Sequence, residues 1–265
     1  MAERLTPGAA DWVELAGAHL SRYLFALDYG RGGRVLDAGT GCGYGARLLK
    51  AGGAACVQAI DIHPEALRLA RERYGGEGIE FLVDDCQELG RVAGPFDLVT
   101  SFENIEHLAE PERFLAAAGR VLAPNGALVV STPDRAASPP YVNGRPKNPF
   151  HLREWYREEF RELLAGYFEE VDLRAQVESA ALRSRIEAVA ALGDALMWTS
   201  PLVMCLWRKL RRGPSRERLW KKLAGLAAPT VGDYPILPLA TAEIFGKPAF
   251  HVAVCRKPKS PWRSA

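Results

Sequence analysis

Acidic and imidazole side chains gather at two places in the middle of the chain, within Glu103–His107 and at His151. On a helical turn, Glu103, Glu106 and His107 would stand at positions i, i+3 and i+4 and project from one face. With His151 as a fourth ligand, such a set suits a divalent cation such as Mg²⁺ or Mn²⁺. Without a metal, Glu106, His107 and His151 are the candidate catalytic residues, and either histidine suits a general base. A hydrogen-bonded network that only shapes a pocket is an equal alternative.

A glycine-rich segment, Asp37-x-Gly39-x-Gly41-x-Gly43, follows a short apolar run and precedes a helical stretch. Glycine lets the backbone turn sharply and approach a ligand without a Cβ in the way. Gly41-x-Gly43-x-x-Ala46 also fits a dinucleotide-binding loop, but the carboxylate of Asp37 would repel a pyrophosphate. The same carboxylate suits a ligand that carries an ammonium and a sulfonium group. The segment therefore favours S-adenosylmethionine as the cofactor over a dinucleotide or a ligand-free turn.

Short apolar runs alternate with helical stretches along the chain, and this pattern predicts the elements that position these residues. The predicted strands span residues 34–38, 57–62, 79–83, 96–102, 127–131, 168–176 and 250–255, and the predicted helices 10–29, 46–51, 65–74, 112–122 and 154–164. Such alternation predicts an α/β fold, a doubly wound and mostly parallel sheet covered on both faces. Asp61 ends the second strand, where its carboxylate can accept two ribose hydroxyls.

The late part of the chain departs from this pattern, which predicts two units. Residues 1–176 and 245–265 are expected to form the catalytic domain, and residues 177–244 a helical insertion before the last strand. An insertion of this length far exceeds an ordinary connection and suits a cap or lid over an acceptor site. Its segment 192–212 combines Met and Trp with a basic end, so peripheral contact with a membrane surface is a second interpretation.

Composition sets limits on partners and compartment. The chain has 265 residues and a formal net charge of +2, which is too small to indicate a polyanionic partner. Nucleic acid is therefore not the favoured acceptor. The five cysteines are scattered without a CxxC pair, and no signal peptide precedes the first helix, so a cytoplasmic protein is expected. Nothing in the sequence indicates an oligomeric state.

Taken together, these motifs resemble the class I S-adenosylmethionine-dependent methyltransferases over about residues 10–176 and 250–256. The matching segments are Asp37 to Gly43, Asp85-Cys86-Gln87-Glu88-Leu89, Phe96-Asp97-Leu98-Val99 and Leu122 to Leu128. The resemblance implies a seven-stranded sheet with an antiparallel last strand, and it implies that Arg22 and Tyr23 cover the cofactor. It also implies that Asp85 binds the adenine amino group and the Cys86 amide a ring nitrogen. The cofactor-binding residues so expected are Asp37, Gly39, Gly41, Gly43, Asp61, Ile62, Asp85, Cys86 and Phe102.

The candidate catalytic segment resembles two branches of that family. Glu103, Glu106 and His107, followed by His151 and Glu154-Trp155, resemble the metal-binding segments of small-RNA 3′-terminal 2′-O-methyltransferases. Ser101 to His107 and Asn148 to Glu154 resemble, more broadly, bacterial methyltransferases that act on sugars, glycans, lipids or natural products. The expected function is methyl transfer to oxygen or nitrogen of a small-molecule, sugar, glycan or lipid-linked acceptor. A metal-assisted RNA 2′-O-methyltransferase and a non-catalytic cofactor-binding regulator are the alternatives.

Overall fold

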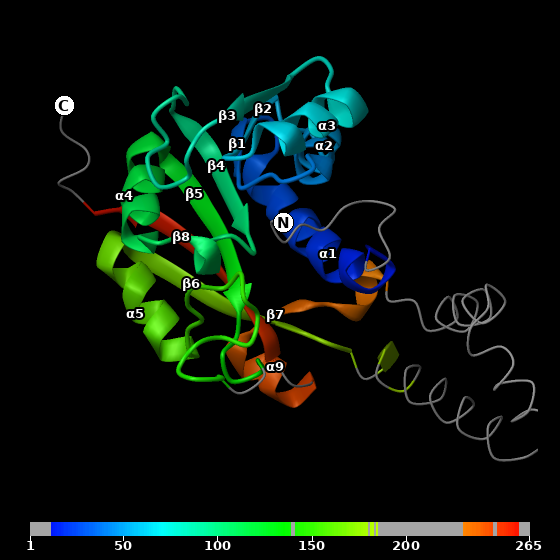
Figure 1. Cartoon of the computed structure of the whole chain (residues 1–265), viewed down its shortest axis with the longest axis vertical. Helices are drawn as coiled ribbons and strands as arrows, with labels where there is room; N and C mark the ends of the chain where they lie inside the picture. The colour runs from blue at the N-terminus through cyan, green and yellow to red at the C-terminus, as the bar shows by residue number, and fades with distance from the viewer. Residues whose placement is uncertain are drawn as a thin grey trace, which may run out of the picture.

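In the computed structural model, residues 12–138, 141–179, 181–182, 184, 230–245 and 248–259 are described. Within these residues one sheet carries eight strands in the order β3-β2-β1-β4-β5-β8-β6-β7 (Figure 1). The strands are β1 (Arg34–Ala38), β2 (Cys56–Asp61), β3 (Ile79–Val83), β4 (Phe96–Phe102), β5 (Leu122–Pro133), β6 (Phe168–Val177), β7 (Ile236–Pro238) and β8 (Pro248–Pro258). The α-helices are α1 (Trp12–Gly30), α2 (Tyr44–Ala51), α3 (Pro64–Tyr74), α4 (Pro111–Val121), α5 (Arg157–Tyr167) and α9 (Leu239–Phe245), and two short 3-10 helices are η1 (Ile105–His107) and η2 (Val231–Asp233).

The strand directions confirm the predicted doubly wound sheet. Strands β1 to β5 run parallel, and β8 lies antiparallel between β5 and β6. The prediction of seven strands was wrong by one, because β7 pairs with β6 at the sheet edge. This strand comes from the predicted insertion 177–244, whose segment 192–212 lies outside the described residues. The cap or membrane helix there, and the division into two units, remain predictions.

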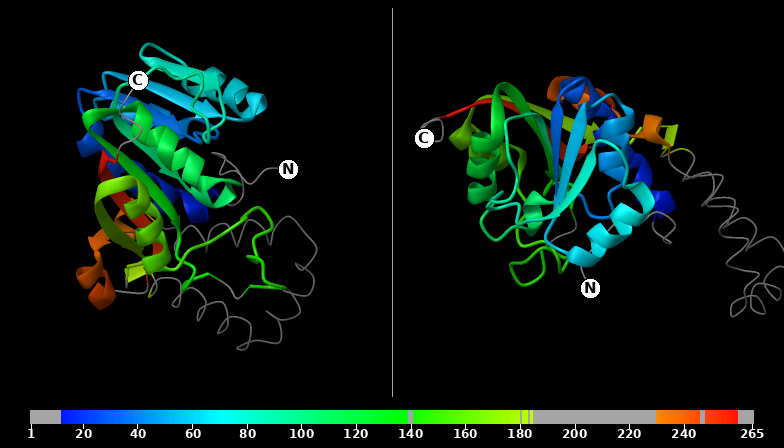
Figure 2. Two further views of the ribbon diagram at one scale, coloured as in Figure 1. Left: turned by 90° about the vertical axis from the view of Figure 1, so that its left-hand side faces the viewer. Right: turned by 90° about the horizontal axis from the view of Figure 1, so that it is seen from above.

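Helices cover both faces of the sheet (Figure 2). Two apolar cores lie between these helices and the sheet. Helices α1, α2 and α3 pack on one face around residues such as Leu49 and Leu67. Helices α4 and α5 pack on the other around residues such as Phe114 and Leu164. Both cores are fully buried, so the sheet is a rigid platform. Among the helices that are described, none is long and apolar enough to span a membrane.

The strand order reverses between β1 and β4, which are neighbours in the sheet but not in the chain. In open α/β sheets, ligands bind outside the carboxyl ends of the strands at such a switch point. Asp37 is the last residue of β1 that pairs with β4, where it lies in register with Thr100. The glycine turn follows β1, and Glu103 to His107 follow β4, so both candidate segments emerge at one edge of the sheet.

Candidate active site

A cavity of about 660 Å³ opens at this edge of the sheet. Seven of the expected cofactor residues line it, namely Gly39, Gly41, Asp61, Ile62, Asp85, Cys86 and Phe102. All four expected metal ligands, Glu103, Glu106, His107 and His151, line it as well. The cavity therefore joins the predicted cofactor and acceptor segments in one continuous space, which the sequence alone did not establish.

The glycine turn forms the floor of the cofactor half of the cavity. Gly39, Gly41 and Gly43 have φ angles of 80°, 55° and 80°, which are left-handed and favour glycine. A Cβ at Gly41 would meet no atom within 4 Å, so this position leaves open space for a ligand. A Cβ at Gly43 would lie 2.7 Å from Ala70. Gly43 does not line the cavity, and its role is to let α2 pack closely against α3.

Asp37 lies behind the turn rather than in the cavity. Its carboxylate is 1% exposed and accepts hydrogen bonds from Thr40 at 2.6 Å, Thr100 at 2.8 Å and Tyr23 at 3.2 Å. Burial raises the pKa of Asp37, while the three hydroxyl donors act in the opposite direction. Asp37 does not line the cavity, so a direct contact of its carboxylate with the cofactor remains a prediction. Its hydrogen bond from Thr40 ties the side chain to the glycine turn.

Two further acidic residues line the cofactor half of the cavity. Asp61 accepts hydrogen bonds from the backbone amides of Gly41 at 3.0 Å and His63 at 2.9 Å. Asp85 accepts one from the Gln87 amide at 2.8 Å. These two carboxylates lie at or just after the ends of the neighbouring strands β2 and β3, beside the glycine turn. As hydrogen-bond acceptors they fit a ligand with ribose hydroxyls and an adenine amino group. Cys86 is buried and its pKa is raised to about 12, so its thiol is not a nucleophile.

Glu103 occupies a different position from the one predicted. Its φ angle is 50°, and only residues 105–107 form a 3-10 turn, so Glu103, Glu106 and His107 do not share one helical face. The Glu103 carboxylate lies 2.8 Å from Nη1 of Arg22 and accepts a hydrogen bond from Ser131 at 2.7 Å. Arg22 is fully buried, and its guanidinium stacks 4.4 Å from the ring centre of Phe250. Glu103 is thus half-buried at the cavity and forms an ion pair with a buried arginine.

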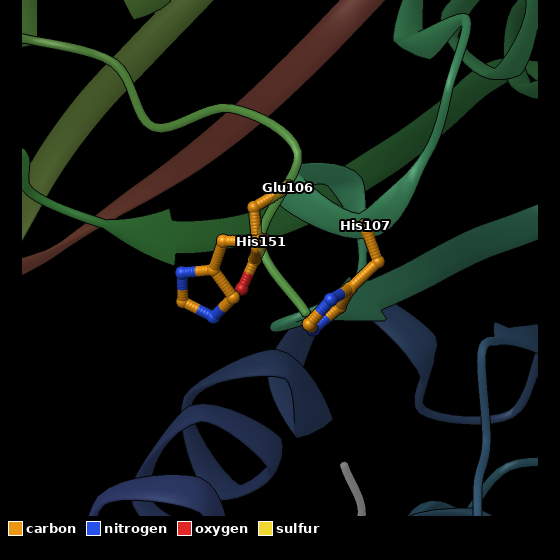
Figure 3. A group of neighbouring side chains, drawn as sticks. All are labelled: Glu106, His107 and His151. Atoms are coloured by element: carbon orange, nitrogen blue, oxygen red, sulfur yellow. The ribbon is translucent and has the colours of Figure 1, made fainter. Parts of the chain in front are cut away.

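Glu106, His107 and His151 do come together (Figure 3). One ligand atom from each lies within 4.8 Å of the others. Glu106 is 1% exposed and accepts a hydrogen bond from Thr132 at 3.1 Å. Burial and the nearby charge of Glu103 raise the pKa of Glu106 well above its ordinary value. A buried acid beside two imidazoles can hold a proton or, once ionised, bind a cation.

Both imidazoles are held through Nδ1. Nδ1 of His107 lies 2.9 Å from the carbonyl oxygen of Phe150, and Nδ1 of His151 lies 2.7 Å from Oε1 of Glu154. These oxygens accept hydrogen bonds, so each Nδ1 carries the hydrogen and each Nε2 is an acceptor in the neutral ring. Nε2 of His151 lies 3.0 Å from Asn148. The rings meet edge to face, with their centres 5.0 Å apart.

Sequence reasoning missed the residues that hold these side chains. Glu154, which is 5% exposed, was included only as part of a resemblance, yet it fixes the ring of His151. Thr132 and the Phe150 carbonyl gave no signal in the sequence, because their roles depend on the path of the chain after β5. The backbone of this segment is tied to η1, where the Glu106 carbonyl accepts a hydrogen bond from the Leu152 amide at 2.8 Å.

Comparison with known proteins assigns the chain to a family. A family described as a methyltransferase domain matches residues 36–130. A "probable S-adenosylmethionine-dependent methyltransferase" of Mycolicibacterium smegmatis is 33% identical over 246 residues, 91% of this chain and 89% of that protein. A ubiquinone biosynthesis O-methyltransferase of Xanthomonas axonopodis pv. citri is 36% identical over 107 residues, 39% of this chain and 44% of that enzyme.

Solved structures agree with these matches at the level of the fold. The [4+2]-cyclase SpnF is similar with a TM-score of 0.57 and 20% identity, over 96% of this chain and 85% of that one. An S-adenosylmethionine-dependent methyltransferase of Thermotoga maritima gives a TM-score of 0.58 with 19% identity, over 94% of this chain and 93% of that one.

Proposed function

The chain belongs to the S-adenosylmethionine-dependent methyltransferases, and we propose that it methylates an oxygen or nitrogen atom of a small-molecule, sugar or glycan acceptor. Family membership favours an enzyme over a non-catalytic regulator. The observation that carries the proposal is that the imidazoles of His107 and His151 line the same cavity as the glycine turn, Asp61 and Asp85. A cofactor on the turn and an acceptor beside the imidazoles would share one space.

The residues of the cofactor half have separable tasks. When bound, S-adenosylmethionine would supply an electrophilic methyl group: the acceptor atom would bond to the methyl carbon as the carbon–sulfur bond breaks, and the neutral thioether would leave. The backbone at Gly39 and Gly41 cradles this ligand, Asp61 suits its ribose, and Asp85 suits its adenine amino group. Tyr23 is 4% exposed and lines the cavity, where it closes the cofactor half from the α1 side. Holding two reactants in line supplies much of the rate enhancement in such a displacement.

The residues of the acceptor half favour a hydroxyl as the methylated group. A hydroxyl must lose its proton as the new bond forms, and a positioned base takes it. His107 suits this role, because its Nδ1–H donates to Phe150 and its Nε2 is therefore the accepting nitrogen. His151 is held by Glu154 and suits the task of orienting the same acceptor. Arg22 compensates the charge of Glu103, so this ion pair adds no net charge to the lining of the cavity.

A panel of acceptors with labelled S-adenosylmethionine tests the proposal. Methyl transfer to sugars, glycans or small hydroxylated molecules is expected, and His107→Ala should slow it about 100-fold or more while cofactor affinity by calorimetry stays the same. Tight cofactor binding without transfer to any acceptor would contradict an enzymatic role. Transfer at the wild-type rate in His107→Ala would contradict the role of this imidazole.

A metal-assisted reaction on the 2′-hydroxyl of an RNA 3′ end is the second candidate. The grouping of Glu106, His107 and His151 supports it, since carboxylate and imidazole ligands suit Mg²⁺ or Mn²⁺. Glu103 is engaged by Arg22 and is a poor fourth ligand. Elemental analysis and assays with EDTA and added Mn²⁺ distinguish the two candidates. Unchanged activity in EDTA without bound metal would refute the second, and transfer to RNA that requires Mn²⁺ would refute the first.

A further inference from the structure

The segment between β5 and α5 presents an unusual surface beside the cavity. Six large apolar side chains are strongly exposed among the described residues, and four of them, Val142, Phe150, Leu152 and Tyr156, lie within residues 142–156. We name residues 141–153 the mouth segment, because Phe150 and Leu152 also line the cavity. Figure 2 shows this segment, in green, projecting from the body of the domain.

The mouth segment is ordered by specific contacts rather than by chance packing. Asn143 and Gly144 have φ angles of 51° and 74°, and Val142 and Arg145 exchange two backbone hydrogen bonds across them, of 2.9 and 3.1 Å. This is a two-residue hairpin turn of the type that Asn-Gly favours. It exposes Val142 and Arg145 at its base. The far end of the segment is tied to η1 through the Leu152 amide and the Phe150 carbonyl.

Charge on the mouth segment is of one sign. Residues 141–153 contain Arg145, Lys147 and Arg153, all exposed, and no Asp or Glu. Exposed apolar groups interleaved with exposed cations are what a protein needs to rest on an anionic lipid surface. Aliphatic side chains such as Val142 and Leu152 do not stack on bases, and Phe150 is the one strongly exposed aromatic side chain of the mouth segment. The same surface therefore matches single-stranded nucleic acid less well than lipid.

We propose that the mouth segment docks the enzyme on an anionic lipid surface, with Val142, Phe150 and Leu152 inserted among the lipids and the three cations at the headgroups. The cavity then opens at the membrane interface, and His107 and His151 face an acceptor whose apolar part remains in the lipid. This surface goes beyond the proposed function, and its binding can be measured without any methyl transfer. Failure of one proposal is therefore distinguishable from failure of the other.

Cosedimentation of the full chain with vesicles tests the docking surface. The chain is expected to bind vesicles of equimolar phosphatidylcholine and phosphatidylglycerol, and much less to pure phosphatidylcholine or at high salt. Phe150→Ser/Leu152→Ser should weaken binding by at least about tenfold. Arg145→Ser/Lys147→Ser/Arg153→Ser should weaken it about 100-fold, since each cation near an anionic surface contributes about fivefold.

A matched control is Leu24→Ser/Arg47→Ser, which removes one exposed apolar side chain and one exposed cation away from the cavity and should leave vesicle binding unchanged. Thermal unfolding and cofactor calorimetry verify that every variant is folded. Wild-type binding that persists in both mouth variants would overturn the proposal, because another part of the chain would then make the contact. The proposal would also be overturned if the wild type did not bind vesicles and the mouth variants abolished its dimerisation in light scattering or its binding to an RNA oligonucleotide.

Discussion

Replacement of Glu106 by Gln tests the electrostatics of the acceptor half of the cavity. Glu106 is buried beside Glu103, and both features favour its protonated form. Gln is a neutral isostere of a protonated carboxyl group, so Glu106→Gln should fold and pack as the wild type does. The two proteins should differ only in how their stability depends on pH.

The sign and size of the difference follow from proton linkage. Below the ordinary glutamate pKa of 4.5, the side chain is protonated in the folded and the unfolded wild type, and pH has no differential effect. Above it, the unfolded chain releases a proton that the folded chain keeps. Wild-type stability then falls by about 1.4 kcal/mol per pH unit relative to Glu106→Gln, until the pH reaches the raised pKa of the folded state. For a chain of this size, that is roughly 2–4 °C in Tm per unit.

Urea unfolding at about pH 5, 6 and 7 in EDTA measures this difference. The free energy of unfolding of Glu106→Gln should exceed that of the wild type by an amount that grows with pH. Glu169→Gln, on an exposed position of β6, measures the generic effect of removing one carboxyl group. A difference that stays constant over this range for Glu106→Gln would refute the raised pKa. A variant that loses all activity yet shows the expected stability would indicate that the reaction needs the ionised carboxylate.

Four further outcomes follow from the site geometry. His107→Ala should lower kcat by about 100-fold or more with an unchanged cofactor Kd in calorimetry. Asp61→Ala should weaken cofactor binding at least about tenfold in the same measurement, since the ribose hydroxyls of the cofactor would lose their hydrogen-bond acceptor. Gly43→Ala should cost about 2 kcal/mol in urea unfolding, because φ is 80° and the new Cβ would meet Ala70 at 2.7 Å. Glu154→Gln should lower kcat more than it raises KM, and unchanged kinetics would contradict its role in holding His151.

The sheet could be predicted from the sequence because hydrophobic periodicity reflects burial, and burial in a doubly wound sheet follows a simple alternation. The extra strand β7 could not. Its three residues, Ile236–Pro238, are too few for a periodic signal. They pair with β6, although a long stretch of sequence separates the two strands. Within β5 the register with β4 shifts between Phe96 and Leu98, so residues 123–126 bulge out of the ladder.

The cofactor half of the site could be predicted because it depends on local backbone geometry. The glycines at 39, 41 and 43 adopt the left-handed φ angles that their type and spacing indicate. The acceptor half depends on contacts between distant segments. Helical spacing placed Glu103 with Glu106, but Arg22 on α1 draws the Glu103 carboxylate away, and no pattern within the segment Glu103–His107 reveals a partner eighty residues earlier.

The charges around the acceptor half indicate which acceptor chemistry it suits. The charge of Glu103 is balanced by Arg22, and burial raises the pKa of Glu106, which favours its protonated form. Glu154 is the third carboxyl group, but it does not line the cavity and reaches the acceptor only through the ring of His151. An acceptor in this space would therefore meet imidazole edges rather than a bare carboxylate. A protonated amine would find no carboxylate there whose attraction offsets the loss of its hydration. A neutral hydroxyl, in contrast, can donate its hydrogen to Nε2 of His107. The balance of charge thus favours oxygen over nitrogen as the methylated atom.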